Sequence, residues 1–253
     1  MRIVSMVPSW TETLLECGCE VVGRTRFCIH PERVKNIPIV GGTKAIDWDK
    51  LAALDADLLL LDREENTRPM REESPIDVFT THVTSVDDLA PELARMATRL
   101  ACPGLEDVAA RWEQVANRPQ GTLKSWRDLP GVIEWLCPPT DQAVGPFTYL
   151  IWCDPWMAIG PDTFIASTLS AVGLPGDLLC PRDSVDGNPK YPVIDPASLP
   201  PGAVLLASSE PYPFHRKRDS LTGLGRPVAI VDGESFSWFG VRSLSFLEGV
   251  SAQ

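Results

Sequence analysis

The apolar run Leu58–Leu61 constrains the fold most, because four leucines between two aspartates match a strand that is buried on both faces. Such a strand is typical of a parallel sheet that helices cover on both sides. Around it, strand patterns alternate with short helical patterns, with strands expected at 3–7, 20–23, 37–40 and 78–83. This alternation predicts the α/β class.

The middle of the chain breaks the alternation with two consecutive helical patterns. The first carries apolar residues at helical spacing, Leu89, Leu93, Met96 and Leu100. The second follows over 105–117, before strand patterns return at 148–152, 204–207 and 228–231 and a last helix at 241–250. We therefore predict an N-terminal α/β lobe over 1–84, a helical linker over 85–120 and a C-terminal α/β lobe over 121–253. Each lobe is expected to be Rossmann-like, with a small, mostly parallel sheet flanked by helices.

Capping signals set the expected helix starts. Ser9 and Glu12 match a capping box, at the start of a helix that should end near Gly18. Asp47 and Asp162 each precede an apolar helical pattern and are expected to cap it. Residues 175–201 are rich in Pro, Gly and Asp with little periodicity, which is typical of a functional or a mobile loop.

The charge and the cysteines restrict the class of protein. Lys and Arg number 23 against 34 Asp and Glu, which gives a net charge of −11 at pH 7. Because this field repels polyanions, we exclude nucleic acid as a general partner. We expect no signal peptide, since no charged start is followed by an apolar stretch of about 7–15 residues. We expect no membrane span, since no apolar run approaches about 18 residues. Seven cysteines without a CxxC pair are typical of a reducing compartment, so we predict a cytoplasmic protein without a structural zinc site.

The polar residues offer little catalytic chemistry. The three histidines, His30, His82 and His215, are isolated from one another, and no GxSxG, P-loop or GxGxxG pattern occurs. The Glu pairs at 64–65 and 72–73 stand among arginines and are interpreted as a solvated, mutually neutralised face. Cys28 and His30 would point to opposite faces of an extended chain. We therefore predict no catalytic residue, and His30 as the one weak metal-ligand candidate.

The large aromatic residues are more informative, because many stand at expected strand ends or helix starts. The carboxyl ends of strands form the ligand crevice of open α/β sheets. Any single tryptophan could equally cap the core beneath a loop. As a set, they predict a flat apolar surface for a ring-bearing ligand.

Residues 2–31, RIVSMVPSWTETLLECGCEVVGRTRFCIHP, resemble the opening of the helical-backbone solute-binding proteins of ABC importers, which bind vitamin B12 and siderophores. The likeness continues through IPIVGG, DWDKLAALDADLLL and a C-terminal D-x-x-x-F-S-W-F-G-x-R, and it covers nearly the whole chain. IWCDPWMAIGPDTFIASTL resembles a branch without a secretion signal.

This resemblance implies a non-catalytic binding protein whose ligand lies in a cleft between the lobes. The implied ligand is a ring-bearing metal chelate, a corrinoid first and a siderophore or haem-like compound second, with no covalent cofactor. By local alignment the corrin-contacting positions fall near Phe27, His30, Trp156 and Tyr191. Arg242 is expected to orient the ligand. The predicted ligand-binding residues are Trp10, Phe27, His30, Trp48, Trp152, Trp156, Tyr191, Trp238 and Arg242.

Two departures from the family pattern concern partners and ligand. Arg68 and Ala197 fall where the importers carry acidic residues that dock the permease, which argues against permease docking. Asp62 replaces a first-lobe tryptophan. Two other functions stay open at this point: an enzyme that uses Asp154, Asp162 or His30 as acid or base, and a protein-interaction module whose tryptophans bind a partner.

Overall fold

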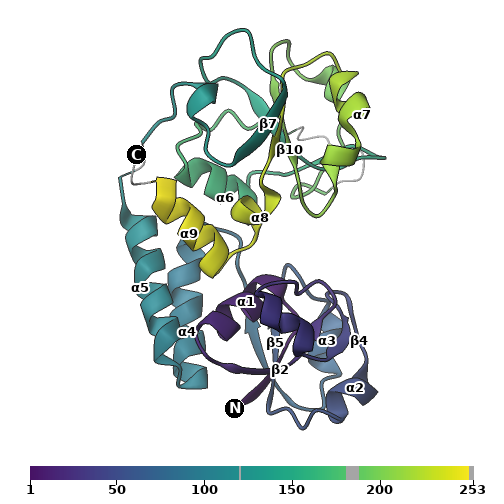
Figure 1. Cartoon of the computed structure of the whole chain (residues 1–253), viewed down its shortest axis with the longest axis vertical. Helices are drawn as coiled ribbons and strands as arrows, with labels where there is room; N and C mark the ends of the chain where they lie inside the picture. Colours follow the sequence, from purple (N-terminus) through teal and green to yellow (C-terminus); the bar gives the residue numbers. More distant parts are fainter. Residues whose placement is uncertain (120, 181–187, 251–253) are drawn as a thin grey trace. The chain divides into compact units, whose positions relative to one another are not determined.

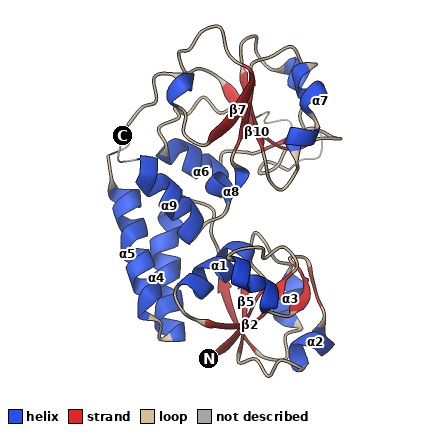
Figure 2. Cartoon of the chain, viewed as in Figure 1, coloured by secondary structure: helices blue, strands red, loops and turns tan. Residues whose placement is uncertain are grey.

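The computed structural model describes residues 1–119, 121–180 and 188–250, and its contacts divide the chain into two compact units (Figure 1). The first unit contains Met1–Asn117 and Trp238–Ser245, and the second contains Arg118–Ser237 and Phe246–Gln253. The contacts thus group the two helices predicted as a linker over 85–120 with the first sheet. Figure 2 shows that each unit combines one sheet with helices.

The sheet of the first unit has the strand order β4-β3-β2-β1-β5-β6. All neighbouring strands are parallel except β3 and β4. The strands are β1 (Arg2–Ser5), β2 (Glu20–Thr25), β3 (Ile39–Gly42), β4 (Ala45–Ile46), β5 (Leu58–Asp62) and β6 (Asp77–Thr81). Every residue of β5 is buried, and β5 lies between β1 and β6. The prediction of a parallel strand covered on both faces is therefore confirmed.

Short helices connect these strands, namely α1 (Pro8–Glu16), α2 (Trp48–Ala52), α3 (Arg68–Glu72) and the 3-10 turns η1 (Glu32–Asn36) and η2 (Val86–Asp88). The cap predicted at Asp47 is confirmed, because its carboxylate accepts from the Lys50 amide at 3.2 Å. The capping box predicted at Ser9 is wrong. Proline is favoured at the first helical position, and here Pro8 begins α1 directly after Val7, so Ser9 lies inside the helix.

Two longer helices, α4 (Leu89–Leu100) and α5 (Pro103–Asn117), pack side by side (Figure 1). Leu89, Leu93 and Met96 are buried along one face of α4, as their spacing predicted. Ala101, in the left-handed conformation, ends α4, and Pro103 begins α5.

The sheet of the second unit has the order β7-β11-β10-β8-β9. Its centre is parallel, and each edge strand pairs antiparallel with its neighbour. The strands are β7 (Val132–Cys137), β8 (Phe147–Trp152), β9 (Met157–Ala158), β10 (Val204–Ser208) and β11 (Val228–Val231). Strand β7 was not among the predicted strands. It lies at the edge of the sheet and none of its residues is buried, although Ile133, Trp135 and Cys137 share one face.

The helices of this part of the chain are α6 (Phe164–Ala171), α7 (Arg218–Thr222), α8 (Gly233–Ser237), α9 (Val241–Val250) and the 3-10 turns η3 (Trp126–Asp128), η4 (Pro196–Ser198) and η5 (Phe214–Arg216). The cap predicted at Asp162 is wrong. The Thr163 hydroxyl accepts from the Ala166 amide at 3.2 Å, which places Asp162 one residue outside the cap. Within the long loop over 175–201, residues 181–187 lie outside the described ranges.

The predicted α/β class, with two helix-flanked sheets, is confirmed. No helix within residues 1–119, 121–180 and 188–250 is long and apolar enough to cross a membrane.

Candidate ligand-binding site

The strand order of the first sheet places a topological switch point between β1 and β5. From β1 the chain moves outward through β2, β3 and β4, and it then returns to β5 and β6 on the other side. Ligands of open α/β sheets bind beyond the carboxyl ends of the strands at such a point. The residues that follow these strand ends are therefore where a site is expected.

Asp62, at the end of β5, is fully buried and anchors a polar network at this edge. Its carboxylate accepts from the Thr81 hydroxyl at 2.7 Å, the Glu64 amide at 2.9 Å and the Val83 amide at 3.2 Å. Burial raises the pKa of Asp62, and these hydrogen bonds oppose the rise. The resemblance implies a tryptophan at this position. This chain instead has a carboxylate, which connects the loops after β5 and β6 by hydrogen bonds.

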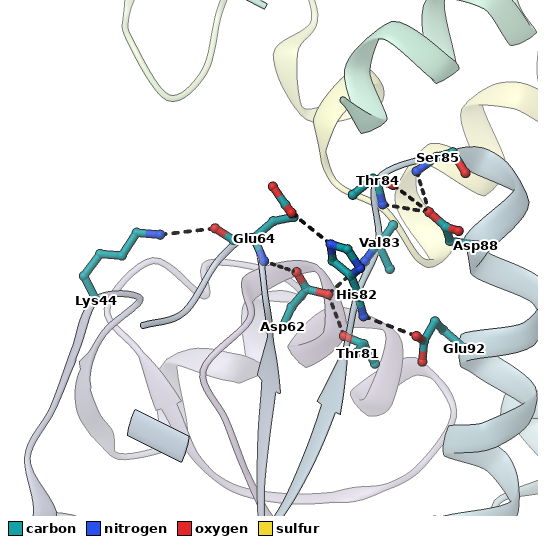
Figure 3. Close-up of polar contacts among 10 residues, drawn as sticks. All are labelled: Lys44, Asp62, Glu64, Thr81, His82, Val83, Thr84, Ser85, Asp88 and Glu92. Carbon is teal, nitrogen blue, oxygen red and sulfur yellow. Dashed lines mark hydrogen bonds and ion pairs between the residues drawn. The ribbon is translucent and has the colours of Figure 1, made fainter. Parts of the chain in front are cut away.

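Glu64 and His82 extend the network outward from Asp62. Nε2 of His82 lies 3.0 Å from Oε1 of Glu64, and the Lys44 ammonium donates to the Glu64 carbonyl at 3.2 Å. Figure 3 shows the imidazole directed toward Glu64, above Asp62 at the strand ends. The Glu64 side chain is 25% exposed, and its carboxylate meets a residue that follows the neighbouring strand instead of the arginines beside it in the sequence.

Glu65 also differs from a solvated carboxylate. Burial raises its pKa, Lys44 opposes the rise, and the charges of Asp62 and Glu64 add to it. A raised native pKa contributes stability that is present at low pH and lost as the pH increases through that pKa.

We expect Glu65→Gln to remove the loss of stability that accompanies ionisation of Glu65. The difference in free energy of unfolding between the variant and the wild type should increase in the variant's favour above about pH 4.3, the pKa of an unperturbed Glu. It should become constant above the native pKa of Glu65. Urea titrations between pH 4 and 8 measure the difference, and the exposed Glu73→Gln serves as control. A pH-independent difference for Glu65→Gln would contradict the assigned burial.

Aromatic side chains gather beside His30 in the first unit. The His30 and Trp238 rings are 5.4 Å apart, edge to face, and the Arg242 guanidinium lies 5.6 Å from the Trp238 ring. His30 and Trp238 are half-buried, whereas Phe27, in the turn after β2, is 46% exposed. The predicted ligand contacts His30, Trp238 and Arg242 thus come together although His30 follows β2 and the other two lie at and before the start of α9.

Arg242 is held by a carboxylate of α1. Its Nε donates to Oε2 of Glu12 at 2.9 Å and its Nη2 donates to Oε1 at 2.6 Å. Both side chains are mostly buried, with exposed fractions of 26% and 11%. This bidentate pair fixes the guanidinium against Trp238, so Arg242 positions an aromatic ring rather than standing open to a ligand.

Two predicted residues lie in the core instead. Trp10 is 0% exposed, its Nε1 donates to the Thr81 hydroxyl at 2.9 Å, and its ring meets Phe239 at 4.9 Å. Trp48, at the start of α2, is half-buried against the apolar cluster around Val40. Trp10 therefore offers no surface to a ligand, which corrects its prediction as a ligand contact.

Cys28 is buried as well. Its sulfur lies 3.2 Å from the hydroxyls of both Thr11 and Thr25, and burial raises the pKa of the thiol. A thiol in this setting is a poor nucleophile.

In the second unit the switch point falls between β8 and β10, and four aromatic residues follow these two strands. We call them the aromatic row: Trp152, Tyr212, Phe214 and Trp156. The Trp152 and Tyr212 rings are 4.8 Å apart, as are those of Tyr212 and Phe214, and Phe214 stacks on Trp156 at 6.1 Å. Trp152 is 42% exposed at one end of the row.

Sequence reasoning missed Tyr212 and Phe214. Both follow the predicted strand at 204–207, so the same rule that selected Trp152 could have found them. Tyr191 lies in the segment that pairs with β9, where its amide donates to Oδ1 of Asn188 at 3.2 Å.

The residues that would serve an enzyme or a metal are dispersed. Asp154 and Asp162 are exposed in the second unit, and His30 belongs to the first. No group of three His, Cys, Asp or Glu side chains placed for a metal ion occurs in the described part of the chain. At the expected docking positions, Arg68 binds Glu72 through Nε at 2.6 Å and Ala197 is exposed in η4.

No family model and no curated protein sequence matches this chain. Solved structures match it over nearly its full length. The periplasmic vitamin B12 binding protein BtuF of Vibrio cholerae covers 99% of this chain with 95% of its own, at a TM-score of 0.65 and 14% identity. For a periplasmic heme binding protein from Pseudomonas aeruginosa, the match covers 99% of this chain and 91% of that protein, at a TM-score of 0.69 and 19% sequence identity. For the periplasmic heme-binding protein RhuT from Roseiflexus sp. RS-1, the match covers 99% of this chain and 96% of that protein, at a TM-score of 0.64 and 20% sequence identity.

These comparisons correct one prediction and support another. The predicted cytoplasmic location is contradicted, because the matched proteins are named as periplasmic. All three are named as binding proteins, and at 14–20% identity they show that this chain shares their fold. The chain has the fold of the periplasmic vitamin B12- and haem-binding proteins, in agreement with the helical-backbone solute-binding family of ABC importers that its sequence resembles.

Proposed function

We propose that this chain binds a ring-bearing metal chelate, a corrinoid first and a haem-like or siderophore ligand second. The observation that carries the proposal is the accessible aromatic surface at the carboxyl edge of each sheet, around Trp238 in the first unit and Trp152 in the second. Flat macrocycles gain apolar contact and stacking energy on such rings. Vitamin B12 and haem are the ligands named for the matched structures.

Within this function, Phe27 and Trp152, which are 46% and 42% exposed, and the half-buried Trp238 supply contact area. The predicted contacts Trp156 and Tyr191 are half-buried as well. Glu12 and Arg242 hold Trp238 in place. The fully buried Trp10 has no role in contact with the ligand. The protein would carry the ligand unchanged and, like its periplasmic neighbours, outside the cytoplasm.

His30 favours the haem-like ligand as the second candidate. A half-buried imidazole beside an aromatic ring can offer a nitrogen to iron, and histidine is a common axial ligand of haem. A corrinoid requires no protein nitrogen for its contacts with aromatic rings, so the two ligands should differ in their dependence on His30.

A titration of the purified chain with cyanocobalamin, dicyanocobinamide, haemin and a ferric hydroxamate tests the proposal. We expect quenching of tryptophan fluorescence by at least one chelate, and a shifted Soret band if haemin binds. His30→Ala should abolish the Soret shift and leave corrinoid affinity within about twofold, while the exposed His215→Ala should change neither. Absence of saturable quenching with all four chelates would overturn the proposal, and conversion of a chelate to a product would favour an enzyme instead.

A further inference from the structure

Two cysteines outside the site lie at equivalent places, each in the turn that follows a helix. Gly18, with φ +78°, ends the turn after α1 and is followed by Cys19, whose amide donates to the Leu14 carbonyl at 2.9 Å. Ala101, with φ +50°, ends α4 and is followed by Cys102, whose amide donates to the Ala97 carbonyl at 3.1 Å. Both turns are thus fixed by backbone hydrogen bonds to their own helices.

The two turns meet within the first unit. Sγ of Cys19 lies 3.3 Å from Sγ of Cys102, although the residues are 83 positions apart in the sequence. The Cys102 thiol also donates to the Cys17 carbonyl at 3.4 Å. A Cβ added at Gly104 would lie 3.2 Å from Cβ of Cys17, which shows how closely the start of α5 approaches the turn after α1.

We propose that Cys19 and Cys102 form a disulfide under oxidising conditions, which binds the α4–α5 hairpin covalently to the start of β2. The sulfur atoms would have to approach from 3.3 Å to the bond length of about 2.05 Å. Both side chains are half-buried, so a small disulfide reagent can reach them and no large opening is required.

The oxidant is a small-molecule disulfide such as oxidised glutathione. A thiolate of one cysteine attacks a sulfur of the reagent, forms a mixed disulfide and releases the first reagent thiol. The second cysteine then attacks the protein sulfur of the mixed disulfide and releases the second reagent thiol. The two cysteine protons end on the two released thiols, so the protein loses two electrons and the reagent gains them.

Burial raises the pKa of Cys19 to about 12, with Cys102 and then Cys17 adding to the rise. Burial likewise raises the pKa of Cys17 to about 11. Because thiolates are the attacking species, the oxidation should be slow at neutral pH and faster at pH 9.

The full-length protein is incubated with oxidised glutathione or with dithiothreitol and then alkylated under denaturing conditions. Intact-protein mass spectrometry counts the alkylated thiols. We expect the oxidised wild type to lose two of its seven reactive thiols. Cys17→Ser should lose two as well, whereas Cys19→Ser and Cys102→Ser should lose none. Because the linked loop is long, the oxidised wild type and Cys17→Ser should unfold at a Tm higher by on the order of 10 °C.

Peptide mapping decides the pairing even if a variant fails to fold. Trypsin leaves Cys17 and Cys19 on the peptide 3–24 and Cys102 on 100–111, and fragmentation of the linked pair places the bond. A bond from Cys102 to Cys17, or seven reactive thiols after oxidation, would overturn the proposal. This outcome is independent of chelate binding, because the thiols lie outside the aromatic surfaces.

Discussion

Replacing Trp10 by alanine should lower the free energy of unfolding by about 3–5 kcal/mol. The indole is fully buried, packs edge to face on Phe239 and donates to the Thr81 hydroxyl. The same hydroxyl donates to the buried carboxylate of Asp62. Truncation therefore leaves a large cavity and removes one donor from a buried polar chain. Urea denaturation followed by far-UV circular dichroism measures the loss.

Two variants serve as controls for this result. Trp10→Phe keeps most of the apolar volume but lacks the N–H. It should therefore lower the free energy of unfolding by less than Trp10→Ala does, by about 1–3 kcal/mol. Trp152→Ala removes a ring that is 42% exposed and should cost less than about 1.5 kcal/mol. If Trp10→Ala destabilised the protein no more than Trp152→Ala, the assignment of Trp10 to the core would be wrong.

Arg242→Ala should destabilise the protein by about 1–3 kcal/mol, because it leaves the Glu12 carboxylate largely buried without its bidentate partner. Partial solvent exposure of the pair keeps the value below that of a fully buried ion pair. A double-mutant cycle with Glu12→Gln should give a coupling energy of about 1 kcal/mol or more.

The pair Arg68–Glu72 provides a matched control on the surface. Its side chains are 85% and 54% exposed, so Arg68→Ala should change the free energy of unfolding by less than about 0.5 kcal/mol. Equal effects of Arg242→Ala and Arg68→Ala on the free energy of unfolding would mean that the contact with Glu12 does not stabilise the fold.

The sequence allowed the regular elements to be predicted where apolar periodicity was strong. The strand at 228–231 and the helix at 241–250 have the predicted bounds, and β5 differs only at its ends. The missed strand β7 lies at an edge without buried residues, where no burial pattern marks it. The N-cap of α1 is Val7, two residues before the predicted Ser9, and the N-cap of α6 is Thr163, one residue after the predicted Asp162. Several residues near each helix start could serve as caps, so the sequence does not fix the boundary.

The candidate site was harder to predict, because position after a strand does not determine which way a ring points. Trp10 and Trp152 both stand near strand ends, yet the helical turn that begins at Pro8 directs Trp10 inward. The pairing of Glu64 was missed for another reason. Its sequence neighbours are arginines, but its partner His82 comes from the adjacent strand, and only the sheet brings the two together.

The dissociation constants of cyanocobalamin and haemin, measured by fluorescence for the wild type and for matched alanine variants, test whether the exposed aromatic surfaces bind the ligand. Trp238→Ala and Trp152→Ala should each raise the dissociation constant of the preferred chelate about tenfold, which corresponds to about 1.4 kcal/mol of binding free energy. Ile133→Ala, which removes an apolar side chain that is 60% exposed on β7, should bind as the wild type does. Wild-type affinity in both tryptophan variants, with their fold intact, would contradict this account.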